Sequence, residues 1–145
     1  MAPSETGRRS DPFVDSYISS DVDLHVLLQA APEPTLPVLL AIRVLQECLN
    51  GKRLARDAII AAQAVPVEGS NPELLILMLS SWAELSCRLS RPAEAETLIR
   101  RAHTILSDST RPEIRAHVML VESLLADTRG NKDVRERILR EIVKM

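Results

Sequence analysis

The sequence predicts an all-α fold built from stacked helical hairpins, and three observations lead to this fold class. The dipeptide Pro-Glu occurs at 32–33, 72–73 and 112–113, an interval of 40 residues each time. Self-similarity at a fixed interval of this size is typical of repeats in which each unit is too small to bury its own apolar face. Hydrophobic residues make up 46% of the chain but aromatic residues only 2%, so the core must be aliphatic. Glycine occurs only 4 times, which argues against a turn-rich all-β fold.

The N-terminal part of the chain differs from the rest. Residues 1–12 are polar and lack periodicity, so we expect a disordered tail. A helical pattern of apolar residues runs from 13 to 30 and predicts one helix that caps the stack. The remaining chain is expected to form a single helical-repeat domain over 13–145, with units at about 31–70, 71–110 and 111–145.

Each predicted unit holds two helices separated by a tight turn. A proline begins each first helix, where its missing N–H costs little and its φ is already helical. The first helices are predicted at 35–49, 72–88 and 112–127, and the second helices at 52–65, 92–107 and 131–144. Turn-forming residues fall in the same columns of the repeat, at Asn50-Gly51, Ser90-Arg91-Pro92 and Gly130-Asn131.

Short polar side chains precede the first helices and are expected to cap their free N–H groups. Asn71 is the expected N-cap before Pro72, and Ser109 or Thr110 is expected before the third unit. In the first unit several prolines compete, and Thr35 is the expected cap.

Columns that stay apolar from unit to unit mark the predicted packing faces. These columns are Leu39, Leu79 and Met119; Leu45, Leu85 and Leu125; Ile59, Ile99 and Leu139; and Ala62, Ala102 and Ile142.

The order of large and small residues in 76–109 resembles the tetratricopeptide repeat. The residues that carry this resemblance are Leu79, Trp82 and Ala83 in the first helix, and Ala95, Ile99 and Ala102 in the second. The resemblance covers about 35–143, and it implies a right-handed α–α superhelix of about three such hairpins. The period of 40 exceeds the typical 34 of that family, and its Gly-Tyr pair is absent. HEAT-like helical hairpins are therefore the structural alternative.

The resemblance also implies a partner-binding groove, because tetratricopeptide proteins hold extended peptides or helices on the concave surface of their first helices. On this register the groove residues are Leu40, Val44, Glu47, Leu77, Ser80, Ser81, Glu84, His117, Leu120, Val121 and Leu124. The mainly apolar set favours an apolar segment or an amphipathic helix as the ligand. Each residue could equally be one that packs against a neighbouring helix.

The last predicted helix carries a second apolar surface, formed by Val134, Ile138, Leu139, Ile142 and Val143. Solenoids normally close with a polar capping helix, and none follows this stripe in the sequence. We expect a partner or a second copy to cover this open C-terminal face. The alternatives are that the N-terminal helix folds back over it, or that the last helix is simply short and partly polar.

The sequence offers little for catalysis, so the prediction is a protein that is not an enzyme and has no metal or cofactor. The three histidines (25, 103 and 117) lie far apart in sequence, and HExxH, P-loop and GxSxG motifs are absent. Cys48 and Cys87 are interpreted as small core-filling thiols.

Charge and targeting signals favour a soluble cytoplasmic protein without a nucleic-acid partner. The net charge is −2, and no leader or long apolar run is present. A basic strip is interleaved with glutamates and is interpreted as an ion-paired outer face. The strip comprises Arg100, Arg101, Arg135, Arg137 and Arg140.

These observations together predict a protein–protein interaction module. The favoured hypothesis is a chaperone or adaptor that holds an apolar helix or extended segment of another protein, either as a homodimer or in a hetero-complex. In its size and its lack of catalytic residues, the chain is similar to small tetratricopeptide chaperones of bacterial secretion systems. The alternatives are a constitutive scaffold subunit of a larger complex, or a regulatory module of a signalling or transcription apparatus.

Overall fold

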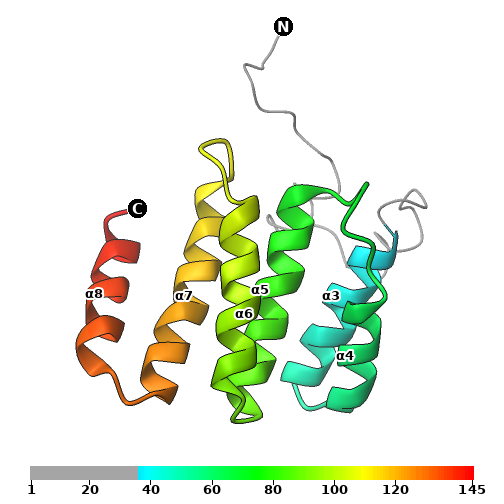
Figure 1. Ribbon diagram of the computed structural model, residues 1–145, viewed down its shortest axis with the longest axis horizontal. Helices are drawn as coiled ribbons and strands as arrows, with labels where there is room; N and C mark the ends of the chain where they lie inside the picture. Colours follow the sequence, from blue (N-terminus) through cyan, green and yellow to red (C-terminus); the bar gives the residue numbers. More distant parts are fainter. Residues whose placement is uncertain (1–35) are drawn as a thin grey trace, which may run out of the picture.

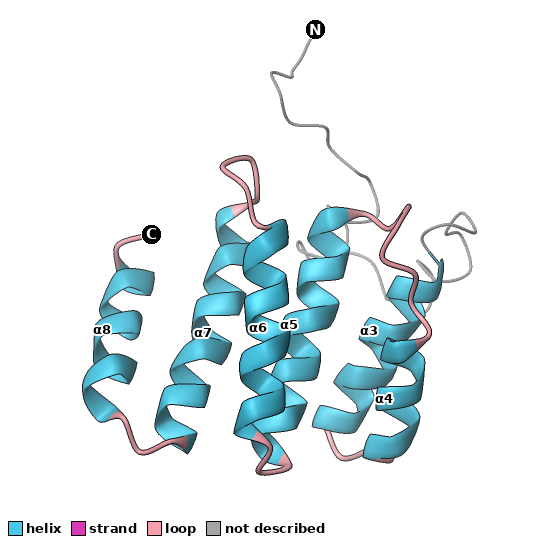
Figure 2. Cartoon of the chain, viewed as in Figure 1, coloured by secondary structure: helices cyan, strands magenta, loops and turns pink. Residues whose placement is uncertain are grey.

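The computed structural model describes residues 36–145, and every regular element within this range is an α-helix (Figure 2). The helices are α3 (Leu36–Leu49), α4 (Ala55–Gln63), α5 (Pro72–Arg88), α6 (Pro92–Ile105), α7 (Pro112–Thr128) and α8 (Lys132–Val143), labelled as in Figure 1. The all-α prediction is confirmed for this part of the chain. The predicted tail at 1–12 and the predicted helix within 13–30 lie outside the described residues.

The helices pair in chain order and stand side by side. α3 packs on α4, α5 on α6 and α7 on α8, while the first helices α3, α5 and α7 also contact one another in sequence. Figure 1 shows the pairs spread along the long axis of the molecule, with α3 and α4 near one end and α8 at the other. The helix positions follow the 40-residue period of the sequence, because Pro72 and Pro112 begin equivalent helices 40 residues apart.

The turns inside the pairs share one backbone solution, as their sequence columns predict. Each places one residue in the left-handed region, with φ of +77° at Gly51, +59° at Ser90 and +73° at Gly130. The following N–H then reaches a carbonyl five residues back, which is the hydrogen-bond pattern of a Schellman C-cap. These bonds join Lys52 to Glu47 at 2.7 Å, Arg91 to Ser86 at 2.9 Å, and Asn131 to Ala126 at 2.8 Å. Ser90 is the one non-glycine residue with positive φ in the described part of the chain.

The predicted cap of α5 is confirmed and that of α7 is wrong. Asn71 Oδ1 accepts from the backbone N–H groups of Glu73 at 2.9 Å and Leu74 at 3.1 Å. Arg111, and neither Ser109 nor Thr110, occupies the N-cap of α7, without a side-chain cap bond. The Thr110 hydroxyl instead accepts from the N–H of Ser107 at 3.0 Å, so it closes the linker turn. Thr35, the cap expected for α3, lies outside the described residues.

Helix α4 is shorter than predicted. The expected range was 52–65, but the helix runs over Ala55–Gln63. Lys52 belongs to the preceding Schellman turn, and Leu54 is extended with φ −73° and ψ 143°. Residues 52–54 therefore complete the turn and its extended exit, and the helix begins after them. The bounds of the other helices differ from the predictions by two residues or fewer.

The core is centred on α5 and weakens towards α8. From Leu74 to Ala83 every residue of α5 is buried, because the helix is enclosed by α3, α6 and α7. In the Leu45, Leu85 and Leu125 column the exposure is 0%, 4% and 8%. Helix α8, in contrast, has no buried residue. The predicted core columns are confirmed in the first two units except at Ile59, which is half-buried. In the third unit Met119, Leu139 and Ile142 are also only half-buried.

Candidate functional site

The predicted groove residues lie on α3, α5 and α7 and fall into three classes of exposure. Leu40 and Leu120 are exposed, at 47% and 49%. Glu47, Glu84, His117 and Leu124 are half-buried. Val44, Leu77, Ser80, Ser81 and Val121 are buried. The two exposed leucines occupy the same column of the repeat as Ser80, which is 0% exposed. The face therefore presents apolar side chains on α3 and α7, with the residues of α5 between them covered.

A partly buried polar pair joins α5 to α7 on this face. The Ser80 hydroxyl lies 2.6 Å from Nδ1 of His117. Since the same hydroxyl donates to the carbonyl of Leu77 at 3.1 Å, its oxygen accepts from the His117 Nδ1–H. In the neutral form of this ring Nε2 carries the lone pair. The arrangement satisfies Ser80 inside the core and fixes the ring of His117.

The protonation of His117 is set by its surroundings. Burial lowers the pKa of the imidazole, and the nearby Glu84 carboxylate opposes this shift only in part. Burial disfavours the charged form of a base, so the neutral ring of the hydrogen-bonded arrangement is also the electrostatically preferred one. The centre of the face consequently carries no positive charge at neutral pH.

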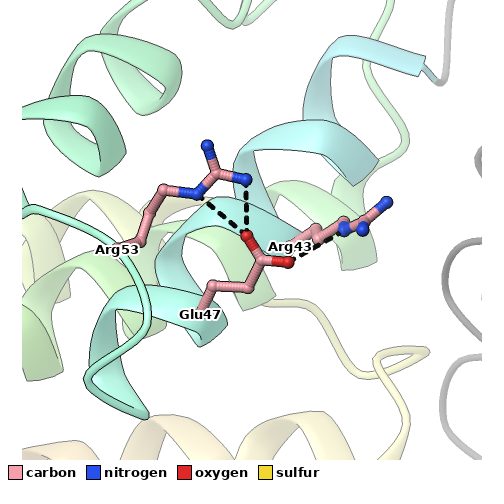
Figure 3. Close-up of polar contacts among 3 residues, drawn as sticks. All are labelled: Arg43, Glu47 and Arg53. Carbon is pink, nitrogen blue, oxygen red and sulfur yellow. Dashed lines mark hydrogen bonds and ion pairs between the residues drawn. The ribbon is translucent and has the colours of Figure 1, made fainter.

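Glu47, the polar groove residue on α3, is held by two arginines (Figure 3). Arg53 binds Oε1 through Nε at 2.9 Å and Nη2 at 2.7 Å, and Arg43 donates to Oε2 at 3.1 Å. The hydrogen bonds from Arg53 and then from Arg43 lower the pKa of the Glu47 carboxyl. Both carboxylate oxygens of Glu47 are therefore engaged within the chain.

Glu84 is the charged groove residue on α5. It accepts from Arg88 Nη2 at 2.8 Å, and Nη1 of the same guanidinium donates to the backbone carbonyl of Leu49 at 2.8 Å. The side chain of Arg88 thus ties the end of α5 to the end of α3. This pair orders the rim of the face, and exposed ion pairs of this kind add little to stability.

The open C-terminal face predicted on α8 is divided in the structure. Val134, Ile138, Leu139 and Ile142 are half-buried, whereas Val143 is 86% exposed. The first group lies against the rest of the chain, since α8 packs on α7. Val143 is the residue of the stripe most available to another molecule.

A cavity beside α8 was not predicted from the sequence. It has a volume of about 240 Å³ and is lined by residues of α6, α7, α8 and the turn before α8. The lining residues are Glu96, Ile99, Glu122, Leu125, Ala126, Arg129, Asn131, Val134 and Ile138. A signal for it exists in the sequence, because Glu122 falls forty residues after Trp82 and breaks an apolar column. We refer to this site as the Glu122 cavity.

A partly buried ion pair was also not predicted from the sequence. Glu73, in the first turn of α5, accepts from the backbone N–H of Arg111 at 2.9 Å and lies 3.3 Å from its Nε. The pair links the start of α5 to the start of α7. The sequence feature that could have indicated this pair is the opposite charge of two residues at the starts of α5 and α7, 38 positions apart.

The chemistry available in the described residues is limited. Within 36–145 no group of three or more His, Cys, Asp or Glu side chains is placed to hold a metal ion. Burial raises the pKa of the Cys87 thiol, and Cys48 is half-buried. No helix in this part of the chain has the length and hydropathy needed to cross a bilayer. Comparison with protein-family models, with characterised proteins and with solved structures gives no match to this chain.

Proposed function

We propose that the protein is a non-catalytic interaction module of tetratricopeptide type, which holds an apolar helix or extended segment of a partner across α3, α5 and α7. The observation that carries this proposal is the exposure of Leu40 and Leu120, at 47% and 49%. Both leucines belong to one column of the repeat, on helices that contact α5 from its two sides. Paired helices with adjacent first helices support the proposed right-handed superhelix.

The energetics favour a partner that is held reversibly. Fully burying a leucine contributes about 1.5–3 kcal/mol, so covering the exposed half of each side chain adds roughly 1 kcal/mol. Two such anchors supply about 2 kcal/mol, whereas a dissociation constant of 1 μM corresponds to about 8 kcal/mol. The remainder must come from the rest of the partner segment. This balance suits an adaptor or chaperone that binds and releases its client.

Affinity capture tests this function with charge-introducing variants of the exposed leucines. The double variant Leu40→Glu, Leu120→Glu is compared with Ile60→Glu, because Ile60 is 58% exposed on α4. Purified tagged protein is used on native lysate, and the captured partner is identified by mass spectrometry. We expect the double variant to lose the partner and Ile60→Glu to retain it. Equal capture by all three proteins would refute binding at this face.

A permanent scaffold subunit is the second candidate, and α8 is the observation that favours it. This helix has no buried residue, and Val143 is 86% exposed. An exposed apolar end of this kind is a natural contact in an obligate assembly. Size-exclusion chromatography with light scattering separates the two functions. A stable monomer or dimer supports the adaptor, whereas concentration-dependent aggregation that Val143→Glu abolishes supports the scaffold.

A further inference from the structure

The Glu122 cavity lies away from the residues of the proposed partner-binding face and does not depend on that function. Its walls are mainly aliphatic, with Ile99 from α6, Leu125 from α7, and Val134 and Ile138 from α8. Glu122 adds a carboxylate to this apolar lining, and its side chain is 29% exposed. An apolar cleft with one or a few polar groups has the composition of a binding site.

The other two units carry a buried apolar side chain at this position of the repeat, Ile42 in the first and Trp82 in the second. Trp82 precedes Glu122 by one period, at the corresponding turn of α5. It is 9% exposed and belongs to the hydrophobic core, together with residues of α4 and α6 such as Ala62 and Leu98. The second unit thus supplies its own indole where the third unit supplies a short carboxylate. The volume that a large aromatic ring takes up in one unit is not provided by residue 122 in the next.

The charges around the cavity favour a ligand that donates a hydrogen bond. Glu96 is already neutralised, because it pairs with Arg129 at 2.6 Å and with Arg100 at 2.8 Å. Among the described residues the one ionic partner of Glu122 is His103, whose Nε2 lies 3.2 Å away and is charged only when protonated. A donor that enters the cavity can therefore form a charge-assisted hydrogen bond with Glu122. An anion would meet the like charge of this carboxylate.

The size of the cavity matches one aromatic side chain. Its volume is about 240 Å³, below the roughly 300–1,000 Å³ of pockets that enclose drug-sized ligands. It exceeds the cavity of about 150 Å³ that suffices to bind benzene in another protein. A bicyclic indole falls between these limits. Tryptophan also combines a large apolar body with an N–H donor, as residues that anchor interfaces commonly do.

We propose that the Glu122 cavity binds a tryptophan side chain of a partner protein, with the aliphatic residues of α6, α7 and α8 around the ring and Glu122 accepting its indole N–H. The cavity then acts as an anchor point at a site separate from the exposed Leu40 and Leu120. It would be occupied by the partner in the third unit as Trp82 occupies the core in the second.

N-acetyltryptophanamide is the direct probe, because it presents an uncharged peptide-linked tryptophan. Full-length ¹⁵N-labelled protein is titrated at pH 7.5 and followed by amide chemical shifts. We expect saturable shifts at Ile99, Leu125 and Val134, and no shifts with N-acetylalaninamide. N-acetyltryptophan, which carries a carboxylate, should bind at least roughly threefold more weakly because of Glu122. Absence of saturable shifts at these residues would overturn the proposal.

Two substitutions of Glu122 distinguish the cavity from nonspecific binding. Glu122→Trp supplies the ring from within the chain and should abolish probe binding, while Glu136→Trp adds an indole to α8 at an exposed position outside the lining and should leave binding unchanged. Glu122→Gln keeps the shape of the side chain, so it should still bind but lose the preference for the uncharged probe. If the Glu122→Trp variant is folded by circular dichroism and still binds N-acetyltryptophanamide unchanged, the site is refuted.

The chain's own aromatic residues near its N-terminus are the competing occupants. The full-length protein is therefore also tested with Phe13 and Tyr17 both replaced by serine. We expect the same probe affinity as for the unmodified chain. Binding that appears only after these replacements would assign the cavity to the protein's own segment and overturn the proposal of a partner tryptophan.

Discussion

Replacing leucines that differ only in exposure gives the sharpest test of how the first helices are oriented. Leu79→Ala removes three carbons from a side chain that is 0% exposed on α5. At roughly 0.8 kcal/mol per buried carbon, the transfer loss alone is about 2.4 kcal/mol. The unfilled cavity adds to this loss, and Leu→Ala changes in cores cost about 2–5 kcal/mol in all. We therefore expect Leu79→Ala to lower the free energy of unfolding by about 2–5 kcal/mol.

Leu120→Ala removes the same atoms from a side chain that is 49% exposed on α7. About half of the transfer loss remains, roughly 1 kcal/mol, and no closed cavity is left. The better helix propensity of alanine reduces the loss further. Urea unfolding monitored by far-ultraviolet circular dichroism measures both values, with a constant m-value as the check on two-state behaviour.

The outcome that would refute this orientation is equal destabilisation by the two changes. Leu79→Met serves as a control for tolerance at the buried site, because a swap that conserves volume should cost less than about 1.5 kcal/mol. A domain of this size has a total stability of about 5–15 kcal/mol, so the expected loss for Leu79→Ala is a large and measurable share.

Three further predictions concern protonation and helix ends. Burial lowers the pKa of His117 in the folded protein. Below the ordinary histidine pKa of about 6.5, the unfolded state therefore binds more protons than the folded state. The free energy of unfolding should decrease as the pH is lowered from 8 to 5.5, and it should decrease less in the His117→Gln variant. Identical pH profiles of the two proteins would contradict this. Asn71→Ala removes the cap of α5 and should cost about 1 kcal/mol in urea unfolding, against no measurable loss for Ser109→Ala. Ser90→Gly relieves a φ of +59° at a cost in unfolded-state entropy, and should raise the free energy of unfolding by about 0.5–1 kcal/mol. Destabilisation would show that the serine is not strained.

Much of the fold follows from local rules that the sequence displays directly. The turns at Gly51 and Gly130 require a left-handed residue, and glycine marks that position. Asn71 and Pro72 specify a helix start almost completely, since one supplies the cap and the other the φ angle. Leu45 and Leu85 repeat at the period and are buried in consequence. These features depend on a few neighbouring residues, and so they can be recognised without the structure.

The candidate face could be predicted only in part, because exposure depends on what the whole chain places over each residue. Leu40, Ser80 and Leu120 share one column, yet the middle residue is 0% exposed and the outer two are about half exposed. The bond between Ser80 and His117 joins residues 37 positions apart, and no periodic pattern specifies it. The Glu122 cavity likewise arises from what the third unit lacks relative to Trp82. The change of residue type at 122 can be read from the sequence, but the cavity beside it appears only once the helices are placed.

The start of α7 shows how a local rule can lose to its surroundings. Thr110 has the side chain of a good N-cap, but its hydroxyl bonds to the N–H of Ser107. Arg111 takes the cap position, and its backbone N–H is bound by Glu73 from another helix. A tertiary contact thus satisfies the N–H of the N-cap residue, while no side chain caps the first turn of α7.

Site-specific photo-crosslinking tests the central claim, that the face of α3, α5 and α7 holds a partner segment. A photoreactive phenylalanine analogue is placed at Leu40, Leu120 or Ile60 in the full chain, and each position is 47% or more exposed. Cells that express the protein natively are irradiated, and the adducts are identified by mass spectrometry. We expect one common partner to be crosslinked from Leu40 and Leu120 and not from Ile60. Equal adducts from Ile60, or different proteins from the two leucine positions, would contradict it.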